Sequence, residues 1–245
     1  MNKLKIFCVW LVLPILIMFT TGCGVVDYYF LSPPEDTAQE LSEAGMAAMQ
    51  EKNYGQAIEY FTKLKERYPF SPYTPRAELS LADAYFLDEQ YRAAVDMYKE
   101  FESLHPRDEA IPYVLFQIGL SNLKQFKSID RPQQNISEAL QYFYRLQETF
   151  PGTKYAEKAN EHIIQCKRHQ AEHEIFVADF YWRTKRYAAA WRRYQYVQDN
   201  FPELTAINAY AQKRCQIAYF KAQKKQSQQI RESKEGSWKQ FFDWL

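Results

Sequence analysis

The segment YGQAIEYFTKLKERYP, residues 54–69, combines the spacing of an amphipathic helix with a proline stop. Its apolar and small side chains recur three and four residues apart, at Tyr54, Ala57, Phe61 and Leu64. This spacing places them on one face of a helix. Pro69 ends the helix, because proline lacks an N–H group and clashes with the preceding turn. The segment therefore predicts one helix of a closely packed pair, with the alanine at the point of approach.

The same pattern recurs three more times along the chain. YRAAVDMYKEFESLHP (91–106) and YAAAWRRYQYVQDNFP (187–202) repeat it in full. The remaining copy consists of Ile136, Ala139, Phe143, Leu146 and Pro151, with isoleucine in place of tyrosine. An amphipathic segment precedes each copy, and the first two of these have inner faces at Leu41, Ala44, Gly45 and Ala48 and at Leu81, Ala82 and Tyr85. Paired helices repeated in register are typical of tetratricopeptide (TPR) repeats. We therefore predict an all-α, TPR-type helix-turn-helix solenoid of about five repeats.

The expected solenoid covers residues 37–225, and its repeats differ in length. We place them at about 38–70, 74–107, 110–152, 153–203 and 204–225. The third has an insertion in its inter-helix loop, about 125–135, and the fourth has a long first helix, about 155–184. The fifth is degenerate, and a tail at 226–245 follows it. The tail ends in Trp238, Phe241, Phe242 and Trp244, which either cap the last repeat or dock on a partner.

The N-terminus has the pattern of a secretory signal. Lys3 and Lys5 precede an uncharged run, residues 6–19, that is too short to span a membrane. Thr20-Thr21-Gly22-Cys23 resembles a bacterial lipobox, so we expect a signal peptide at 1–22 and lipidation of Cys23. The alternative is an ordinary signal with an incidental cysteine. Gly24 favours the outer membrane over retention, by resemblance to Gram-negative lipoproteins, and residues 23–36 would form a tether to the periplasmic face.

Composition argues against nucleotide and nucleic-acid functions. The chain has 7 glycines and a formal net charge of +1. A phosphate cradle needs several glycines close together, and the one Gly-x-Gly here lies at Gly22 to Gly24. A near-neutral chain has no general attraction for nucleic acid. We therefore expect no cofactor and no nucleic-acid partner.

One stretch has the form of a zinc-peptidase motif. His169, Glu172 and His173 follow the order His-x-x-Glu-His, and His162 lies seven residues earlier. The stretch falls within the long helix of the fourth repeat, among mixed charges, so we interpret it as a solvated helix face. We predict neither an enzyme nor a metal site.

Cys166 and Cys215 could form a disulfide in an oxidising compartment, although two free thiols are the favoured interpretation.

The first helices of the repeats should line a concave surface that binds peptides or proteins. In the first two repeats this surface would carry apolar and charged side chains, namely Met46, Met49, Arg76, Leu79, Asp83 and Phe86. Methionine and aromatic side chains adapt to varied apolar segments. The alternative is that some of them pack between repeats.

A lipobox followed by about five TPR repeats resembles the BamD family, the TPR lipoproteins of the outer-membrane β-barrel assembly (Bam) machinery. The resemblance covers roughly 38–222. ERYPFSPY (66–73) is its most specific part and contains Arg67, Tyr68, Pro69, Phe70, Pro72 and Tyr73. YV at 113–114, GL at 119–120 and the long helix agree with it. The prolines should fix the repeat junction, and Phe70 and Tyr73 should wedge between repeats.

The resemblance implies a non-catalytic scaffold at the outer membrane. Its last repeats would bind the POTRA domains of a BamA-type barrel protein, beside other Bam lipoproteins. Its first repeats would receive the C-terminal signals of unfolded outer-membrane proteins. Arg193 matches a position where the family presents an arginine to that barrel, and Arg192 is the alternative contact, or both are solvated. Another periplasmic TPR lipoprotein, such as a secretin pilotin or a cell-wall coordination factor, is the alternative function.

Overall fold

The computed structural model describes residues 36–244, and their side chains as far as Lys234. The expected signal peptide, Cys23, the tether up to residue 35 and the aromatic side chains of the tail lie outside this description. In the described part the chain forms α3 (Ala38–Gln50), α4 (Tyr54–Arg67), α5 (Thr74–Leu87), α6 (Tyr91–Leu104), α7 (Ile111–Lys124), α8 (Gln134–Thr149), α9 (Lys154–Arg183), α10 (Tyr187–Asn200) and α11 (Thr205–Trp244).

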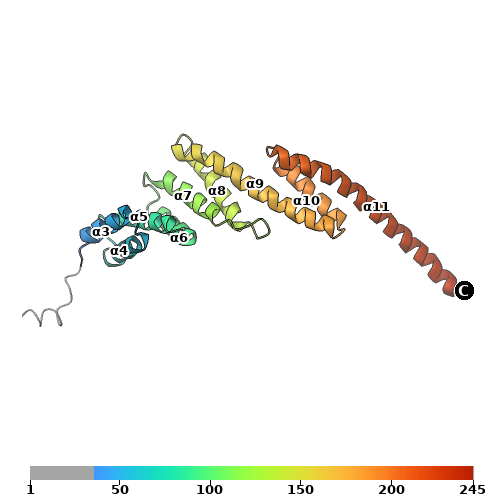
Figure 1. Ribbon diagram of the computed structural model, residues 1–245, viewed down its shortest axis with the longest axis horizontal. Coiled ribbons are helices and arrows are strands. Elements are labelled where there is room, and N and C mark those ends of the chain that lie inside the picture. The colour runs from blue at the N-terminus through green and yellow to red at the C-terminus, as the bar shows by residue number, and fades with distance from the viewer. Residues whose placement is uncertain (1–35, 245) are drawn as a thin grey trace, which may run out of the picture.

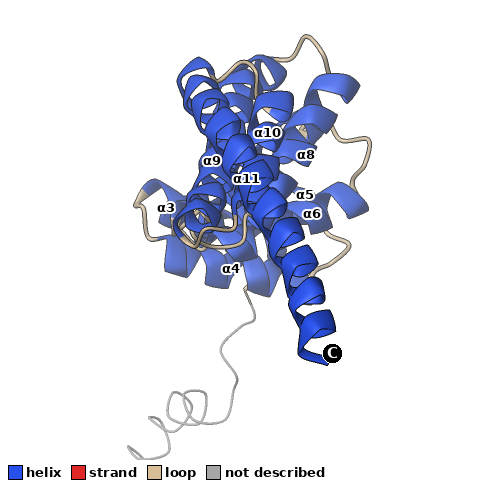
Figure 2. Ribbon diagram, turned by 90° about the vertical axis from the view of Figure 1, so that its right-hand side faces the viewer, coloured by secondary structure: helices blue, strands red, loops and turns tan. Residues whose placement is uncertain are grey.

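Successive helices pair as α3/α4, α5/α6, α7/α8 and α9/α10, and α11 packs on α10. Each pair stacks on the next, so the molecule is a long arch with α3 and α4 at one end and α11 at the other (Figure 1). The view along the arch shows the pairs superposed, with α11 extending beyond them (Figure 2). The prediction of an all-α, TPR-type solenoid is confirmed.

The short turns inside three of the repeats share one backbone conformation. Lys52, Glu89 and Lys185 have φ values of 59°, 59° and 58°, two residues before the second helix of each pair. The following residue closes the turn in each case, as when the Asn53 N–H donates to the Ala48 carbonyl at 2.8 Å. This arrangement caps the carbonyls at the end of the first helix. It turns the chain back in the space of three residues.

The third repeat replaces this turn with a longer loop, as the sequence predicted. The loop runs from residue 125 to 133 and lies against α9. The Phe126 ring stacks on the His169 ring at 3.9 Å between centroids, and His173 Nδ1 is hydrogen-bonded to the Ile129 carbonyl. Helix α9 has 30 residues. It contacts α7 and α8 as well as α10 and α11, so one rigid element joins the third repeat to the fifth.

The last helix differs from our expectation. We expected a degenerate fifth repeat at 204–225 and a separate tail at 226–245. The structure has one helix of 40 residues, α11, that runs through both. Ala211 and Ala218 are buried against the preceding pair, whereas residues 223–234 are exposed. No glycine or proline interrupts the chain between 205 and 234, so nothing in this stretch breaks the helix.

The first and third repeats bury an aromatic ring of the second helix against a glycine of the first. Phe61 meets Gly45, and Phe143 meets Gly119. A Cβ atom built on Gly119 would lie 2.6 Å from Phe143 Cε1, which is closer than carbon atoms can pack. Both rings are almost completely buried, with 1% and 0% of their surface exposed. Glycine is therefore required here because a ring occupies the space of its side chain.

In the second and fourth repeats the buried ring is a tyrosine, and an aspartate accompanies it. Tyr98 Oη donates to Asp83 Oδ1 at 2.5 Å, and Tyr113 Oη of the next repeat donates to the same oxygen at 2.6 Å. Tyr194 and Tyr210 donate to Asp179 in the same way. Where the ring is phenylalanine, the position of the aspartate is apolar, at Met46 and Leu120. A buried hydroxyl needs an acceptor, and a phenyl ring does not.

Replacing Gly119 by alanine should destabilise the protein. The new methyl group would collide with the Phe143 ring, and overpacking of this kind costs about 1–3 kcal/mol. Gly55, on the exposed side of α4, is the matched control, because a Cβ atom there meets nothing within 4 Å. Gly55→Ala should be neutral or stabilise by up to about 1 kcal/mol. Urea unfolding followed by circular dichroism measures both. Equal midpoints for the two variants would contradict the ring-packing argument.

Asp83 should tolerate asparagine better than leucine. Asparagine keeps the Oδ1 acceptor, whereas leucine leaves two tyrosine hydroxyls without one, at a cost of about 2–4 kcal/mol. Burial raises the pKa of Asp83, against the opposing hydrogen bonds from Tyr113 and Tyr98. A carboxyl whose pKa is raised in the folded state binds its proton more tightly there, so acidification stabilises the fold at this site.

Wild type should therefore gain stability relative to Asp83→Asn as the pH falls from about 7 to about 4.5. Urea titrations of the three proteins at both pH values measure this difference. A leucine variant as stable as the asparagine variant would show that the hydroxyls need no acceptor.

Candidate functional site

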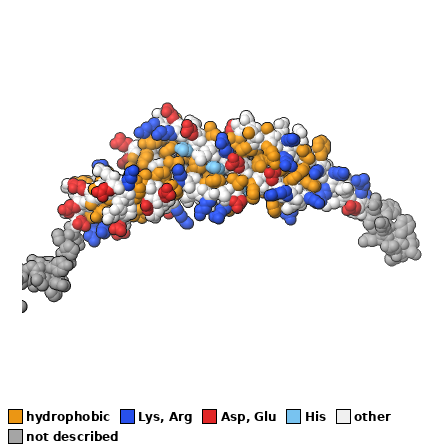
Figure 3. Space-filling model, in the orientation of Figure 1, with side chains coloured by type: hydrophobic (Ala, Val, Ile, Leu, Met, Phe, Trp, Pro, Cys, Tyr) orange, Lys and Arg blue, Asp and Glu red, His pale blue; other side chains and the backbone are white. Residues whose placement is uncertain are grey.

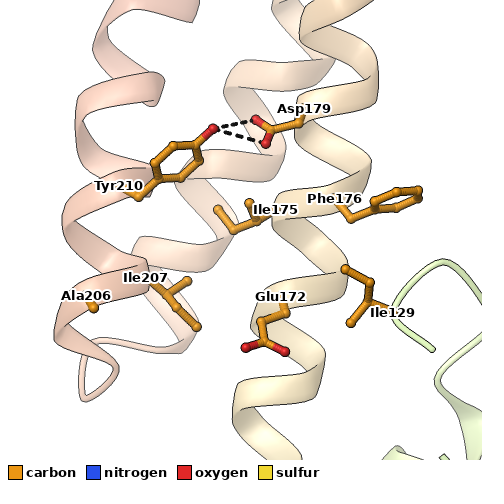
Figure 4. Close-up of a pocket in the computed structure, with 8 residues that line it drawn as sticks. All are labelled: Ile129, Glu172, Ile175, Phe176, Asp179, Ala206, Ile207 and Tyr210. Atoms are coloured by element: carbon orange, nitrogen blue, oxygen red, sulfur yellow. Dashed lines mark hydrogen bonds between the residues drawn. The ribbon is translucent and has the colours of Figure 1, made fainter. Parts of the chain in front are cut away.

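An apolar hollow lies between the first helices of the last two repeats. Side chains of α9, α11 and the loop before α8 line a volume of about 470 Å³ (Figure 4). The lining residues are Ile129, Glu172, Ile175, Phe176, Asp179, Ala206, Ile207 and Tyr210. Ile175 and Ile207 point into the space between the two helices, and Ile129 approaches from the loop. A hollow of this size and lining suits an apolar side chain of a bound segment.

The polar groups at the edge of the hollow are already fixed. Tyr210 Oη lies 3.0 Å from both carboxylate oxygens of Asp179 (Figure 4). The Arg214 Nε–H donates to Tyr210 Oη at 3.1 Å. Burial raises the pKa of Tyr210 and of Tyr194, so both hydroxyls remain protonated donors to Asp179. Asp179 thus holds α9, α10 and α11 together and leaves the apolar side chains to contact a ligand.

Two histidines of the His-x-x-Glu-His stretch hold in place the loop that forms one wall of the hollow. His169 and His173 contact the loop that carries Ile129, and burial lowers the pKa of His169 against the opposing effect of Glu172. His162 stacks on the buried Phe143 ring at 5.5 Å. The structure therefore gives these histidines packing roles. Within residues 36–234, no group of three or more His, Cys, Asp or Glu side chains is placed to hold a metal ion.

The apolar surface continues along α9 beyond the hollow. Phe176 is 38% exposed and Phe180 is 49% exposed, one helical turn apart. Residues four apart lie on the same helix face. This site was not predicted from the sequence. The pair of phenylalanines was visible as a spacing of four, but the position of Ile129 depends on the course of an inserted loop, which no local pattern specifies.

The six residues expected to line a groove in the first two repeats have mixed roles. Met46 and Met49 pack against the core of the first repeats, and Leu79 and Phe86 pack against the central core. Asp83 accepts hydrogen bonds from two tyrosines. Arg76 is exposed. The methionine, leucine and phenylalanine side chains are half-buried, so they combine packing between repeats with some accessible surface.

The ERYPFSPY stretch forms the junction between α4 and α5. Tyr68 Oη donates to the Asp36 carbonyl at 2.8 Å, and Thr74 Oγ1 donates to the Tyr68 carbonyl at 2.6 Å. We expected Phe70 and Tyr73 to wedge between repeats. That expectation is wrong for Phe70, which is 98% exposed, and Tyr73 is 39% exposed. Tyr68 makes the junction contact instead, and the turn after Pro69 points Phe70 outward. Arg67, Pro69 and Pro72 are exposed as well.

The two candidate partner-binding arginines lie in different surroundings. Arg193 Nη1 donates to both carboxylate oxygens of Glu174, at 3.0 and 2.8 Å. These hydrogen bonds raise the pKa of Arg193, so it remains charged. Arg192 is exposed and lines a second hollow, together with Lys185, Arg186 and Lys225. The structure therefore does not bring the two guanidinium groups into one contact.

The two cysteines of the described part, Cys166 and Cys215, are free thiols. They are not joined to each other, and burial raises the pKa of Cys166 to about 12. The interpretation as two free thiols is confirmed.

No helix in the described part combines the length and the apolar character that crossing a membrane requires.

Comparisons with known proteins agree on one family. Residues 34–234 match the YfiO family model, described as outer membrane lipoprotein. The chain is 28% identical over 183 residues to the outer membrane protein assembly factor BamD of Vibrio cholerae, covering 71% of this chain and 76% of that protein. It is 32% identical over 161 residues to the protein of the same name from Rickettsia prowazekii, covering 66% of this chain and 64% of that protein.

Among solved structures, the chain is similar to TPR proteins. These include the TPR2AB domain of yeast Sti1, at 15% identity and a TM-score of 0.46, covering 76% of this chain and 70% of that chain. A thermophilic TPR protein of Thermus thermophilus matches at 14% identity and a TM-score of 0.40, covering 73% of this chain and 98% of that chain. Because the family model spans most of its length, the chain belongs to the YfiO family of outer membrane lipoproteins.

Proposed function

We propose that this chain is a non-catalytic adaptor of outer-membrane protein assembly, attached by a lipid at Cys23 to the periplasmic face of the outer membrane. Family membership supports a role at the outer membrane, and relatives named assembly factor BamD support a role in assembly. The lipobox supports the attachment. The apolar hollow between α9 and α11 is the observation that supports binding of unfolded protein segments.

The proposed clients are the C-terminal signals of unfolded outer-membrane proteins, which are extended and end in an aromatic residue. The hollow offers apolar walls from three segments of the chain, and the wall from the loop is fixed by hydrogen bonding and stacking. A fixed site binds without the entropic cost of ordering its walls. The accessible parts of Met46, Met49, Leu79 and Phe86 would contact other parts of a client, and the exposed Arg76 would pair with a client carboxylate.

The proposed partner is the POTRA region of a BamA-type barrel protein, bound through Arg192 and Arg193, with other Bam lipoproteins nearby. A carboxylate of the partner that binds Arg193 must compete with Glu174, whereas Arg192 makes no ion pair among the described residues. We therefore assign the larger share of the contact to Arg192. An arginine that binds a carboxylate through two N–H groups also orients the partner.

Removal of the Ile129 side chain should weaken client binding. Ile129→Ser deletes one wall of the hollow, and the loss of about 1–2 kcal/mol of apolar contact weakens binding about five- to thirtyfold. Ile164→Ser is the matched control, because Ile164 is 49% exposed on α9 outside the hollow. Fluorescence anisotropy with a labelled C-terminal peptide of an outer-membrane protein measures both. Equal affinity of the two variants would place the client elsewhere.

Charge reversal at Arg192 should release the barrel protein. Arg192→Glu places like charges together at the interface, and a tagged chain from detergent-solubilised outer membranes should retain at least about tenfold less of the BamA-type protein. Arg193→Glu should have a smaller effect, and Arg168→Glu, at an exposed site on α9, should have none. Quantitative mass spectrometry of the purified complex measures the ratio.

A result in which both reversals leave the barrel protein bound would contradict this interface. Recovery of a secretin, or of cell-wall factors without a BamA-type protein, would contradict the assembly function itself and favour the alternative TPR lipoproteins.

A further inference from the structure

A second hollow, between the start of α10 and the middle of α11, is strongly basic. Its volume is about 610 Å³, and the cations among its lining residues are Lys185, Arg186, Arg192 and Lys225. The other lining residues are alanine, glutamine, tyrosine and tryptophan, without a carboxylate among them. We call this site the basic hollow. In the space-filling view, blue side chains gather toward the end of the molecule where α11 runs (Figure 3).

The cations of the basic hollow form no ion pair within the described residues. The ion pairs found between residues 36 and 234 involve other side chains, including the neighbouring Arg193 with Glu174. Lys225 Nζ donates only to the Lys185 carbonyl, at 3.4 Å. Lys221 lies 4.5 Å from the centre of the Trp182 ring. Positive charge concentrated in this way attracts anions from solution.

The basic character continues along α11. From residue 221 to 234 the sequence has five lysine or arginine residues and one acidic residue, Glu232. This stretch leaves the body of the solenoid and is exposed on all sides from residue 223. A polar helix with a basic face and no apolar contact of its own is suited to lie along an anionic surface.

We propose that Lys185, Arg186 and Lys225 of the basic hollow, with the adjoining face of α11, bind the phosphate groups of anionic phospholipids at the membrane surface, while Arg192 is left to the barrel protein. An acidic protein segment is the other possible occupant, but the lining does not favour it. Protein interfaces depend on exposed aromatic anchors. Here Trp191 packs on Tyr219 and Tyr187 packs on Trp182, and the accessible remainder is mostly alanine and glutamine.

The shape of the molecule allows this contact at the same time as a lipid anchor. The turn between α9 and α10 and the free end of α11 lie on the same side of the arch as α3 and α4 (Figure 1). One membrane surface can therefore meet both ends. The inference rests on the proposed lipid attachment. A lipid anchor at the N-terminus keeps the α10 and α11 end of the chain near the membrane, where the effective concentration of lipid headgroups is high.

The test uses the full chain, purified from outer membranes with detergent, in vesicles of phosphatidylcholine alone and of phosphatidylcholine mixed with phosphatidylglycerol. Lysines are acetylated briefly, and mass spectrometry reports the rate at each site. Acetylation of Lys185, Lys224 and Lys225 should be at least about threefold slower in the anionic vesicles, and salt should remove the difference. Lys158, exposed in α9, should react equally in both.

A charge-neutralised variant, Lys185→Gln with Arg186→Gln and Lys225→Gln, should lose the protection of Lys224. The matched control carries Lys124→Gln, Lys127→Gln and Lys158→Gln, which are exposed and lie outside the basic hollow, and it should keep that protection. Equal acetylation rates in the two kinds of vesicle would overturn the inference. So would protection that develops only when the barrel protein is added, because the occupant would then be an acidic protein.

The same vesicles separate this inference from the proposed function. A chain that stays with both kinds of vesicle but shows no lysine protection has the lipid anchor without the basic contact, which contradicts the inference alone. A chain that floats with anionic vesicles and not with neutral ones lacks the anchor, yet supports the basic hollow.

Discussion

The contact on which the fold depends is an aromatic ring packed against a residue with little or no side chain. In the first and third repeats the ring fills the space of an absent Cβ atom, at Gly45 and Gly119. This contact sets the distance between the two helices of a pair, and the distance sets how the next pair can stack. The surfaces of the arch follow from this repeated spacing. The hollow between α9 and α11 exists because both helices are first helices, held apart by the α10 that packs between them.

Much of the fold was predictable because this contact is local and periodic. Small residues, rings and prolines recur in register, and the helix pairs, the inserted loop and the long α9 follow from them. The candidate site was less predictable. Ile129 reaches the hollow through contacts of His169 and His173 with a loop that is distant in sequence. Phe70 was expected inside a junction and is exposed, whereas Tyr68 of the same stretch packs against the core of the first repeats.

Asp83 shows why a residue predicted to lie on the binding surface can instead stabilise the fold. Helical spacing places it beside Leu79 and Phe86, and that reasoning is correct for the backbone. Its role is decided by two hydroxyls, from Tyr98 and Tyr113, that reach it from the neighbouring helices. The four repeats alternate in a way that indicates this role. An aspartate occurs at this position where the buried ring is tyrosine, and an apolar residue occurs there where the ring is phenylalanine. Comparison of the repeats with one another would therefore have assigned Asp83 to the interior.

The pairing of Arg193 with Glu174 constrains how a partner can bind. The Arg193 side chain is 45% exposed and that of Glu174 is 16% exposed. A partner that takes the guanidinium leaves a mostly buried carboxylate without its donor, and an unsatisfied buried group costs more than an exposed ion pair contributes. Exchange of one carboxylate for another at Arg193 therefore gains little. Net affinity at this end of the arch has to come from Arg192 and from apolar side chains, with Arg193 serving orientation.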